Sequence, residues 1–242
     1  MPAELGTARR ALAWICGIAG LAVYNWWVLV PFKHGLIRSP DELFSNLEVT
    51  GQPYAVAMQR ADLTAGLLLF AAFVLAGLGR QQREWLGMVA FAIAGTIGGI
   101  FPQVCADGIN ASCRLAERHF QLPFGQYLHD GSGAVEFAGI TLAVWFAVRR
   151  TRGDHDLMAR GYRFLAVAAL VAYPVLGLSY LLNRYGAVME GLFFTGFTLV
   201  VVLQLAERLR RAELSSDHNE EMMVGSSRVK GQRERDGSHV GS

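Results

Sequence analysis

Apolar runs alternate with short polar segments along most of this chain. Six runs cover about residues 11–32, 61–79, 85–101, 131–148, 164–182 and 188–206. Runs such as ALAWICGIAGLAVYNWWVLV and FLAVAALVAYPVLGLSYLL are apolar on every side, whereas a surface helix of a soluble protein keeps a polar face. About 20 apolar residues in a helix suffice to cross a bilayer. The pattern therefore predicts an all-α fold, an integral membrane bundle of six transmembrane helices.

The first run allows a second interpretation. Arg9 and Arg10 precede it, and basic residues also precede the apolar core of a cleavable signal peptide. A signal peptide has a shorter core that ends in small residues, while this run ends in WWVLVPF. We therefore predict an uncleaved span, with a signal peptide as the alternative.

Basic residues mark one side of the predicted membrane. The N-terminus, the second loop, the fourth loop and the segment after the last run hold two, two, five and three Lys or Arg residues. The first, third and fifth loops hold three, two and one. Because Lys and Arg are enriched in cytoplasmic loops, both termini are predicted to be cytoplasmic.

The composition narrows the possible partners and the domain organisation. Only 17% of the 242 residues are charged and the net charge is +2, so nucleic acid is not an expected partner, whereas the lipid bilayer is. No CxxC, HExxH, P-loop or GxGxxG pattern occurs, and we predict neither a metal nor a cofactor. Residues 212–242 carry few apolar side chains and predict a disordered cytoplasmic tail after a transmembrane domain over residues 1–211.

Two cysteines lie in the polar segment between the third and fourth runs. Cys105 and Cys113 fall on the side predicted to face outward, where disulfides persist. A disulfide between them is the prediction, and two free thiols are the alternative. Zinc is less favoured because no paired histidines accompany them.

An acid within a predicted span is the first candidate for chemistry. Glu136 lies inside the fourth run, and its spacing from His129 places both on one face of a helix. Such a group must face other helices, water or a partner. Two interpretations stay open: proton exchange beside His129, or a hydrogen bond that holds helices in register. Asp62, at the start of the second run, is the third catalytic candidate, although capping of a helix N-terminus also explains it.

Three further polar residues are expected at the same outer level and are candidates for ligand binding. They are Asp130, Arg184 and Glu190. Asp130 directly precedes the fourth run, where capping alone accounts for an acid. The predicted inner ends carry arginines, whereas the outer ends mix acids, a histidine and an arginine. This difference predicts an outward-facing polar mouth.

Three stretches of the chain resemble a known family. LEVTGQPYAVAMQRADLTAGLLL, GGIFPQVCADGINASC and YLHDGSGAVEF are similar to segments of a bacterial six-span membrane family, the domain of unknown function number nine hundred and ninety-eight. The resemblance covers about residues 8–210. It implies the fold and a multi-pass location in a bacterial plasma membrane, but no activity. The sixth run departs from the family at EGLFFTG, so the resemblance implies no role for Glu190.

These patterns favour one function and leave two alternatives. The preferred one is an accessory membrane protein whose polar mouth binds a lipid, a lipophilic small molecule or a partner, because no complete catalytic set is present. The alternatives are a membrane-embedded acid/base enzyme acting on a lipid or isoprenoid-like substrate, and a small proton-coupled carrier. The sequence leaves open whether the protein is an enzyme and what its oligomeric state is.

Overall fold

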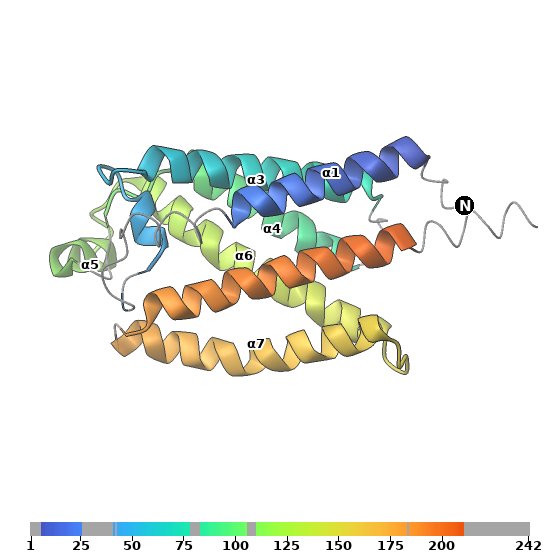
Figure 1. The fold of residues 1–242 in the computed structure, drawn as a ribbon. Coiled ribbons are helices and arrows are strands. Elements are labelled where there is room, and N and C mark those ends of the chain that lie inside the picture. Colours follow the sequence, from blue (N-terminus) through green and yellow to red (C-terminus); the bar gives the residue numbers. More distant parts are fainter. Residues whose placement is uncertain are drawn as a thin grey trace, which may run out of the picture.

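Long helices running up and down along one direction make up the fold. The computed structural model describes residues 6–25, 41, 43–77, 83–105, 110–182 and 184–210. The long helices in Figure 1 are α1 (Thr7–Tyr24), α3 (Ala55–Leu75), α4 (Arg83–Ile100), α6 (Phe124–Arg150), α7 (Leu157–Leu182) and a last helix, Gly186–Arg210. Two short helices, η2 (Ser45–Glu48) and α5 (Ala111–Arg118), lie at one end. Within the described ranges there is no β-strand, which confirms the all-α class.

The two ends of the bundle differ in the residues that they carry. The end with α5, on the left in Figure 1, contains the Cys105–Cys113 bond and is called the disulfide end. The opposite end carries Arg9, Arg150 and Arg208 and is called the arginine end. The first and last described helices both have their outer termini at the arginine end (Figure 1).

Four of the described helices are long and apolar enough to cross a membrane. They are α3, α6, α7 and the last helix, which indicates a membrane protein. α1 and α4 have 18 residues each, and both carry charged side chains within their first four residues. The predicted first run continues to Phe32, and that part lies outside the described residues, as does the predicted tail over 212–242.

Large apolar side chains cover the outside of the bundle. On α7 the exposed ones are Phe164, Val167, Leu170, Val171 and Leu178. A contiguous apolar surface of this kind is rare on a soluble monomer. It suits contact with lipid, in which the backbone polar groups are satisfied within each helix.

Glycines let α3, α4 and α6 pack with their backbones close together. A Cβ on Gly66 would lie 2.6 Å from the backbone nitrogen of Thr96, and one on Gly99 would lie 2.6 Å from the carbonyl oxygen of Gln59. Gly87 and Gly139 face each other in the same way where α4 crosses α6. Small residues at these contacts are the usual device for close packing of membrane helices.

One arginine joins four helices at the arginine end. Arg150 of α6 donates from Nε to Glu84 of α4 at 2.6 Å, and from both terminal nitrogens to Glu207 of the last helix at 2.7 Å. Tyr162 of α7 donates its hydroxyl hydrogen to the same Glu207 carboxylate at 2.8 Å. Both glutamates are buried. Because charge-assisted bidentate pairs are strong and directional, this network fixes the relative positions of these helix ends.

Two other arginines donate hydrogen bonds to carbonyl groups at the C-terminal end of α3. Arg9 donates to the carbonyl oxygen of Leu75 at 2.8 Å, and Arg208 donates to that of Ala76 at 3.3 Å. The last carbonyl groups of a helix have no partners within the helix. These arginines, which the sequence presents as orientation signals, therefore also hold α1 and the last helix against α3.

Candidate functional site

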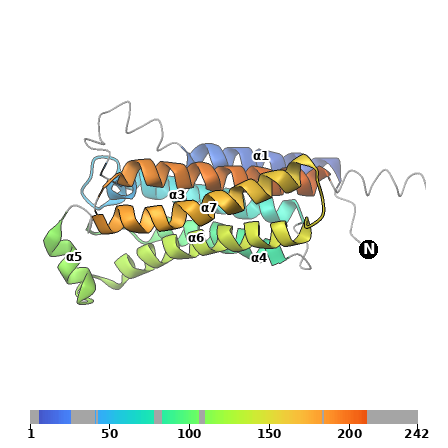
Figure 2. The same ribbon diagram turned by 90° about the horizontal axis from the view of Figure 1, so that it is seen from below.

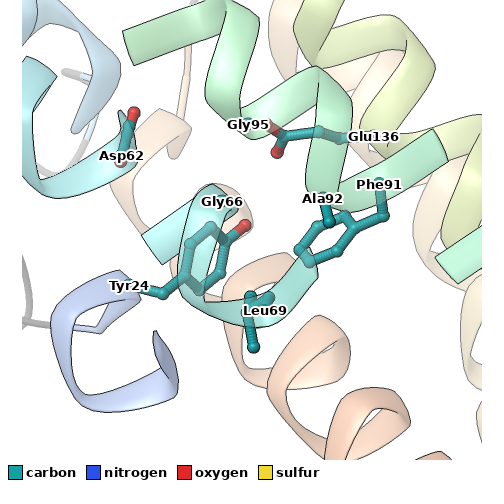
Figure 3. Close-up of a pocket in the computed structure, with 8 residues that line it drawn as sticks. All are labelled: Tyr24, Asp62, Gly66, Leu69, Phe91, Ala92, Gly95 and Glu136. Atoms are coloured by element: carbon teal, nitrogen blue, oxygen red, sulfur yellow. The ribbon is translucent and has the colours of Figure 1, made fainter. Parts of the chain in front are cut away.

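A small cavity lies between α1, α3, α4 and α6 (Figure 3). Its lining consists of Tyr24, Asp62, Gly66, Leu69, Phe91, Ala92, Gly95 and Glu136. The cavity volume is about 10 Å³, which is room for one water molecule. Polar groups from three helices, α1, α3 and α6, therefore meet at a space too small for a lipid.

Glu136 of α6 reaches this cavity across a glycine of α4. Its Oε1 atom lies 3.2 Å from the position that a Cβ on Gly95 would occupy, so the absence of a side chain there makes room for the carboxyl group. Within the described part of the chain, no group donates a hydrogen bond to Glu136. A buried carboxylate without a partner is costly, and a proton removes that cost.

Tyr24, at the C-terminal end of α1, supplies a second polar group without a partner. Its ring packs edge-on against Phe91 at 5.7 Å and against Phe194 at 5.2 Å between centroids. Its hydroxyl is buried, makes no hydrogen bond to the described residues, and points into the cavity (Figure 3). The hydroxyl can donate to or accept from a water molecule there.

Asp62 lies between the cavity and η2. The predicted start of the second helix near residue 61 is wrong, because α3 begins at Ala55 and continues through its polar residues. Asp62 thus lies well inside the helix and does not cap it. Its carboxyl group lies close enough to that of Glu48, the last residue of η2, for the two to interact. Two carboxyl groups can share a hydrogen bond only if one of them carries a proton.

Glu48 is a site residue that the sequence did not single out. It is only 7% exposed, and burial together with the neighbouring charge of Asp62 raises the pKa of Glu48 well above its ordinary value. Its Oε2 atom makes no hydrogen bond within the described part of the protein. An acid in a polar loop gives no sequence signal of burial, because the burial results from η2 folding back over α3.

His129 faces Glu48 from the second turn of α6. Its Nδ1 atom lies 3.2 Å from the carbonyl oxygen of Gly98 and 3.0 Å from that of Phe101. Carbonyl oxygens only accept, so Nδ1 carries a hydrogen and Nε2 is the variable site. Nε2 lies 4.0 Å from Oε2 of Glu48. His129, Glu48, Asp62, Glu136 and Tyr24 are together called the carboxyl cluster.

The predicted pairing of His129 with Glu136 has a different form in the structure. His129 lies against Glu48, whereas Glu136 and Asp62 line the cavity (Figure 3). Among the described residues the two are therefore linked through Glu48 and Asp62 and do not touch. All three predicted catalytic candidates nevertheless gather around one region.

The three predicted ligand-binding candidates are not part of this cluster. The carboxylate of Glu190 accepts hydrogen bonds from the backbone nitrogens of Phe44, at 2.5 Å, and Ser45, at 3.3 Å, and so holds the N-terminal end of η2. Arg184 is exposed, and its backbone nitrogen donates to the carbonyl oxygen of Ser179 at 3.0 Å.

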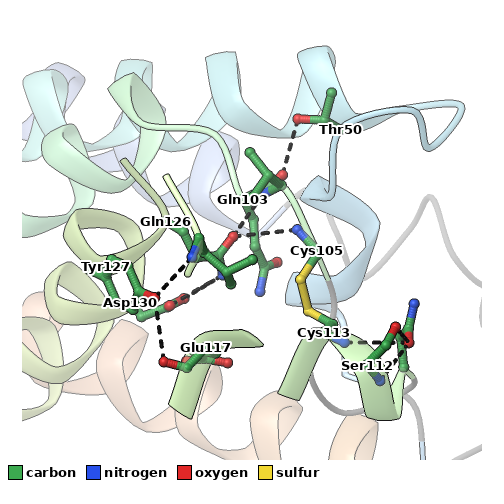
Figure 4. The surroundings of a disulfide bond; sticks show 12 residues. Thr50, Gln103, Cys105, Ser112, Cys113, Glu117, Gln126, Tyr127 and Asp130 are labelled. Atoms are coloured by element: carbon green, nitrogen blue, oxygen red, sulfur yellow. Dashed lines mark hydrogen bonds between the residues drawn. A yellow bond between two sulfur atoms is a disulfide. The ribbon is translucent and has the colours of Figure 1, made fainter. Parts of the chain in front are cut away.

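Asp130 has a partner within its own helix. The predicted start of the fourth helix at residue 131 is wrong: α6 begins at Phe124, so Asp130 is not a cap. Its oxygens accept from Gln126 at 3.2 Å, and Oε1 of Gln126 accepts from the backbone nitrogen of Val104 at 2.7 Å (Figure 4). The helix starts earlier because Gln126 bonds to Val104 in the segment that leaves α4, and Asp130 bonds to Gln126.

The predicted disulfide is confirmed. Cys105 and Cys113 are bonded with their Cα atoms 6.0 Å apart, and the bond ties α5 to the segment that leaves α4 (Figure 4). In the part of the chain that the structure describes, no group of three or more His, Cys, Asp or Glu side chains is arranged to hold a metal ion.

A family model described as protein of unknown function (DUF998) matches residues 16–207. The matched range includes every residue of the carboxyl cluster and the disulfide. Comparisons with curated proteins and with solved structures gave no match.

Proposed function

Given that the chain belongs to the family of proteins of unknown function DUF998, we propose that it is an integral membrane protein whose outer mouth opens and closes with a proton bound at the carboxyl cluster. The mouth is formed by η2 and the neighbouring loop at the disulfide end. A small ligand or a partner protein binds there when η2 moves. The function is thus an accessory or binding one, regulated by protonation.

The proposed topology has six spans, with both termini in the cytoplasm of a bacterial cell and the disulfide end outside. Support comes from the up-and-down order of the long helices, the arginines at the opposite end, and the disulfide itself. After reduction of intact cells, a membrane-impermeant thiol reagent should label Cys105 and Cys113. A tag fused after Ser242 should become accessible only in permeabilised cells. The reverse labelling pattern would invert the topology.

The observation that carries the proposed function is the close approach of the Glu48 and Asp62 carboxyl groups. A hydrogen bond between them joins η2 to α3 only while the pair holds a proton. When that proton leaves, two buried carboxylates repel each other, and η2 is pushed away from the bundle. The proton shared by Glu48 and Asp62 therefore holds η2 against the bundle, and we call it the latch of the mouth. The cavity, with room for one water molecule, is the route by which this proton exchanges with Glu136 and Tyr24.

The size of the cavity also bears on the choice of function. About 10 Å³ accommodates water but no lipid or isoprenoid chain. A lipophilic ligand would thus bind above the cluster, at the mouth, and not inside the cavity.

Hydrogen exchange across a pH series tests the latch on the full chain in nanodiscs. Relative to the intrinsic exchange rate at each pH, the backbone amides of residues 44–49 should be protected at acidic pH and lose this protection as the pH rises. Glu48→Gln should keep η2 protected across the series, because an amide donates to Asp62 without a shared proton. Asp154→Asn, an exposed acid at the arginine end, should behave as the wild type. Protection of η2 that does not change with pH in the wild type would refute the proposal.

An acid/base enzyme is the second candidate, and the geometry of His129 supports it. With Nδ1 held by two carbonyl oxygens, Nε2 is positioned as a proton acceptor beside Glu48. Lipid profiles of cells that carry His129→Gln or Glu136→Gln separate the two candidates. Changed lipid species with normal protein levels would favour the enzyme, whereas unchanged lipids and intact phenotype in Glu136→Gln would remove its support.

A further inference from the structure

α5 lies crosswise to the long helices at the disulfide end (Figure 2). It has eight residues, Ala111–Arg118, and follows the end of α4. The chain then turns at residues 119–123 and enters α6 at Phe124. A helix that is crosswise to membrane spans runs parallel to the membrane surface, which is the orientation of an interfacial helix.

The hairpin formed by α5, the turn at residues 119–123 and the first residues of α6 exposes three large apolar side chains. Phe120 is 81% exposed, Phe124 is 73% exposed and Leu115 is 59% exposed. The Phe120 ring lies 5.5 Å from the ring of Tyr127, one helical turn after Phe124, so both phenylalanines lie beside the same tyrosine. Exposure of this degree in water would be unfavourable, and a partner for these groups is expected.

The apolar groups are held outward by a fixed frame. The disulfide ties the first turn of α5 to the segment that leaves α4, and Oδ1 of Asn110 caps α5 by accepting from the backbone nitrogens of Ser112, at 3.0 Å, and Cys113, at 3.4 Å. The Tyr127 hydroxyl accepts from the backbone nitrogen of Leu122 at 3.2 Å. Their exposure is thus built into the fold.

The position along α6 indicates the layer in which these groups lie. α6 has 27 residues, which at about 1.5 Å per residue is a length of about 40 Å. The hydrocarbon core is about 30 Å thick, and the bilayer with its headgroup regions is about 40–45 Å thick. The first turn of α6 therefore falls in the headgroup layer. Arg118 and His119, both exposed, lie next to Phe120 and suit lipid phosphates.

We infer that α5 and the turn up to Phe124 form an interfacial anchor, which inserts Leu115, Phe120 and Phe124 into the headgroup layer of the bilayer leaflet at the disulfide end. The occupant of this surface is phospholipid, with Arg118 at the phosphate level. The inference requires the bundle to span the membrane, but it does not depend on the proton latch of η2.

Spin-label accessibility tests the anchor in vesicles of phosphatidylethanolamine and phosphatidylglycerol. Phe120→Cys and Phe124→Cys are made in a Cys16→Ser background, in which the disulfide leaves the new thiol as the single labelling site. Collision with oxygen, which concentrates in lipid, is compared with collision with a water-soluble nickel chelate. Gln52→Cys, in an exposed loop at the same end, is the aqueous control, and Leu170→Cys on α7 is the lipid control.

Labels at Phe120 and Phe124 should collide with oxygen several-fold more than the label at Gln52, and with the nickel chelate several-fold less. Their depth should lie between those of Gln52 and Leu170. Values equal to those of Gln52 would show that the hairpin projects into water and would overturn the inference. Protection from both reagents would also overturn it, because it would indicate a protein on this surface. If Leu170 itself reports water, the bundle does not span the membrane and the proposed topology fails.

Discussion

Nε2 of His129 lies 4.0 Å from Oε2 of Glu48, and the two residues come from different elements, α6 and η2. The histidine is oriented by the carbonyl oxygens of Gly98 and Phe101, at the end of α4. Three elements thus meet at this pair, and Glu48 also interacts with Asp62 of α3. The outer loop is joined to the helix bundle through ionisable side chains.

The stability of the protein should depend on pH through Glu48. Burial raises the pKa of Glu48 in the folded state, so the folded protein binds this proton more tightly than the unfolded chain. The free energy of unfolding is therefore highest below the ordinary glutamate pKa of about 4.3 and falls as pH rises through the folded pKa. Glu48→Gln should flatten this dependence in thermal unfolding of the purified protein. A slope equal to that of the wild type would contradict the assignment, and Asp154→Asn serves as the control.

Glu190 should stabilise η2 locally. Its carboxylate accepts from the backbone nitrogens of Phe44 and Ser45, so Glu190→Ala removes a cap worth about 1–2 kcal/mol. Hydrogen exchange of residues 44–49 should accelerate about 5–30-fold, with little change in the long helices. Thr195→Ala is the matched control, because among the described residues that hydroxyl on the same helix bonds only to Gly191, one turn away. Unchanged exchange in residues 44–49 would show that Glu190 does not hold η2.

Loss of Arg150 should destabilise the arginine end. Arg150→Met leaves Glu84 and Glu207 buried without their cation, at a cost of about 3–5 kcal/mol in the free energy of unfolding. Replacing both acids by Gln in the same variant should recover much of this loss in chemical denaturation.

The neighbouring Arg149 provides the control for that prediction. Its guanidinium lies 4.8 Å from the ring centroid of the exposed Trp145, and Arg149→Met should cost no more than about 1 kcal/mol. Equal effects of Arg149→Met and Arg150→Met would indicate that the buried network contributes little.

Two glycines should respond in opposite directions to the same substitution. Gly66→Ala places a Cβ against the backbone of Thr96 and should destabilise by about 1–3 kcal/mol, because α3 and α4 must separate. Gly133→Ala meets nothing within 4 Å, and it should be neutral or stabilise by up to about 1 kcal/mol through helix propensity. Thermal unfolding of the two variants in one detergent measures both. Destabilisation by Gly133→Ala would show that α6 has a further contact on that face.

The pattern of apolar runs determined the helical class and the order of the long helices, because both depend on local composition. The place of the disulfide followed from two cysteines in one loop, on the side opposite the arginines. The same pattern placed the starts of α3 and α6 too late. Its criterion was hydrophobicity, whereas Gln59, Gln126 and His129 remain helical because their side chains find polar partners at the disulfide end.

What only the tertiary structure decided is which acids meet. Glu136 and Asp62 could be predicted as candidates because ionisable residues are expensive in or near a span. Glu48 and Tyr24, the other two cluster residues that the sequence did not single out, could not be predicted, since each reaches the cluster through the packing of another element, η2 or α1. Burial and proximity arise from that packing, and the identity of a residue in the chain carries no record of either.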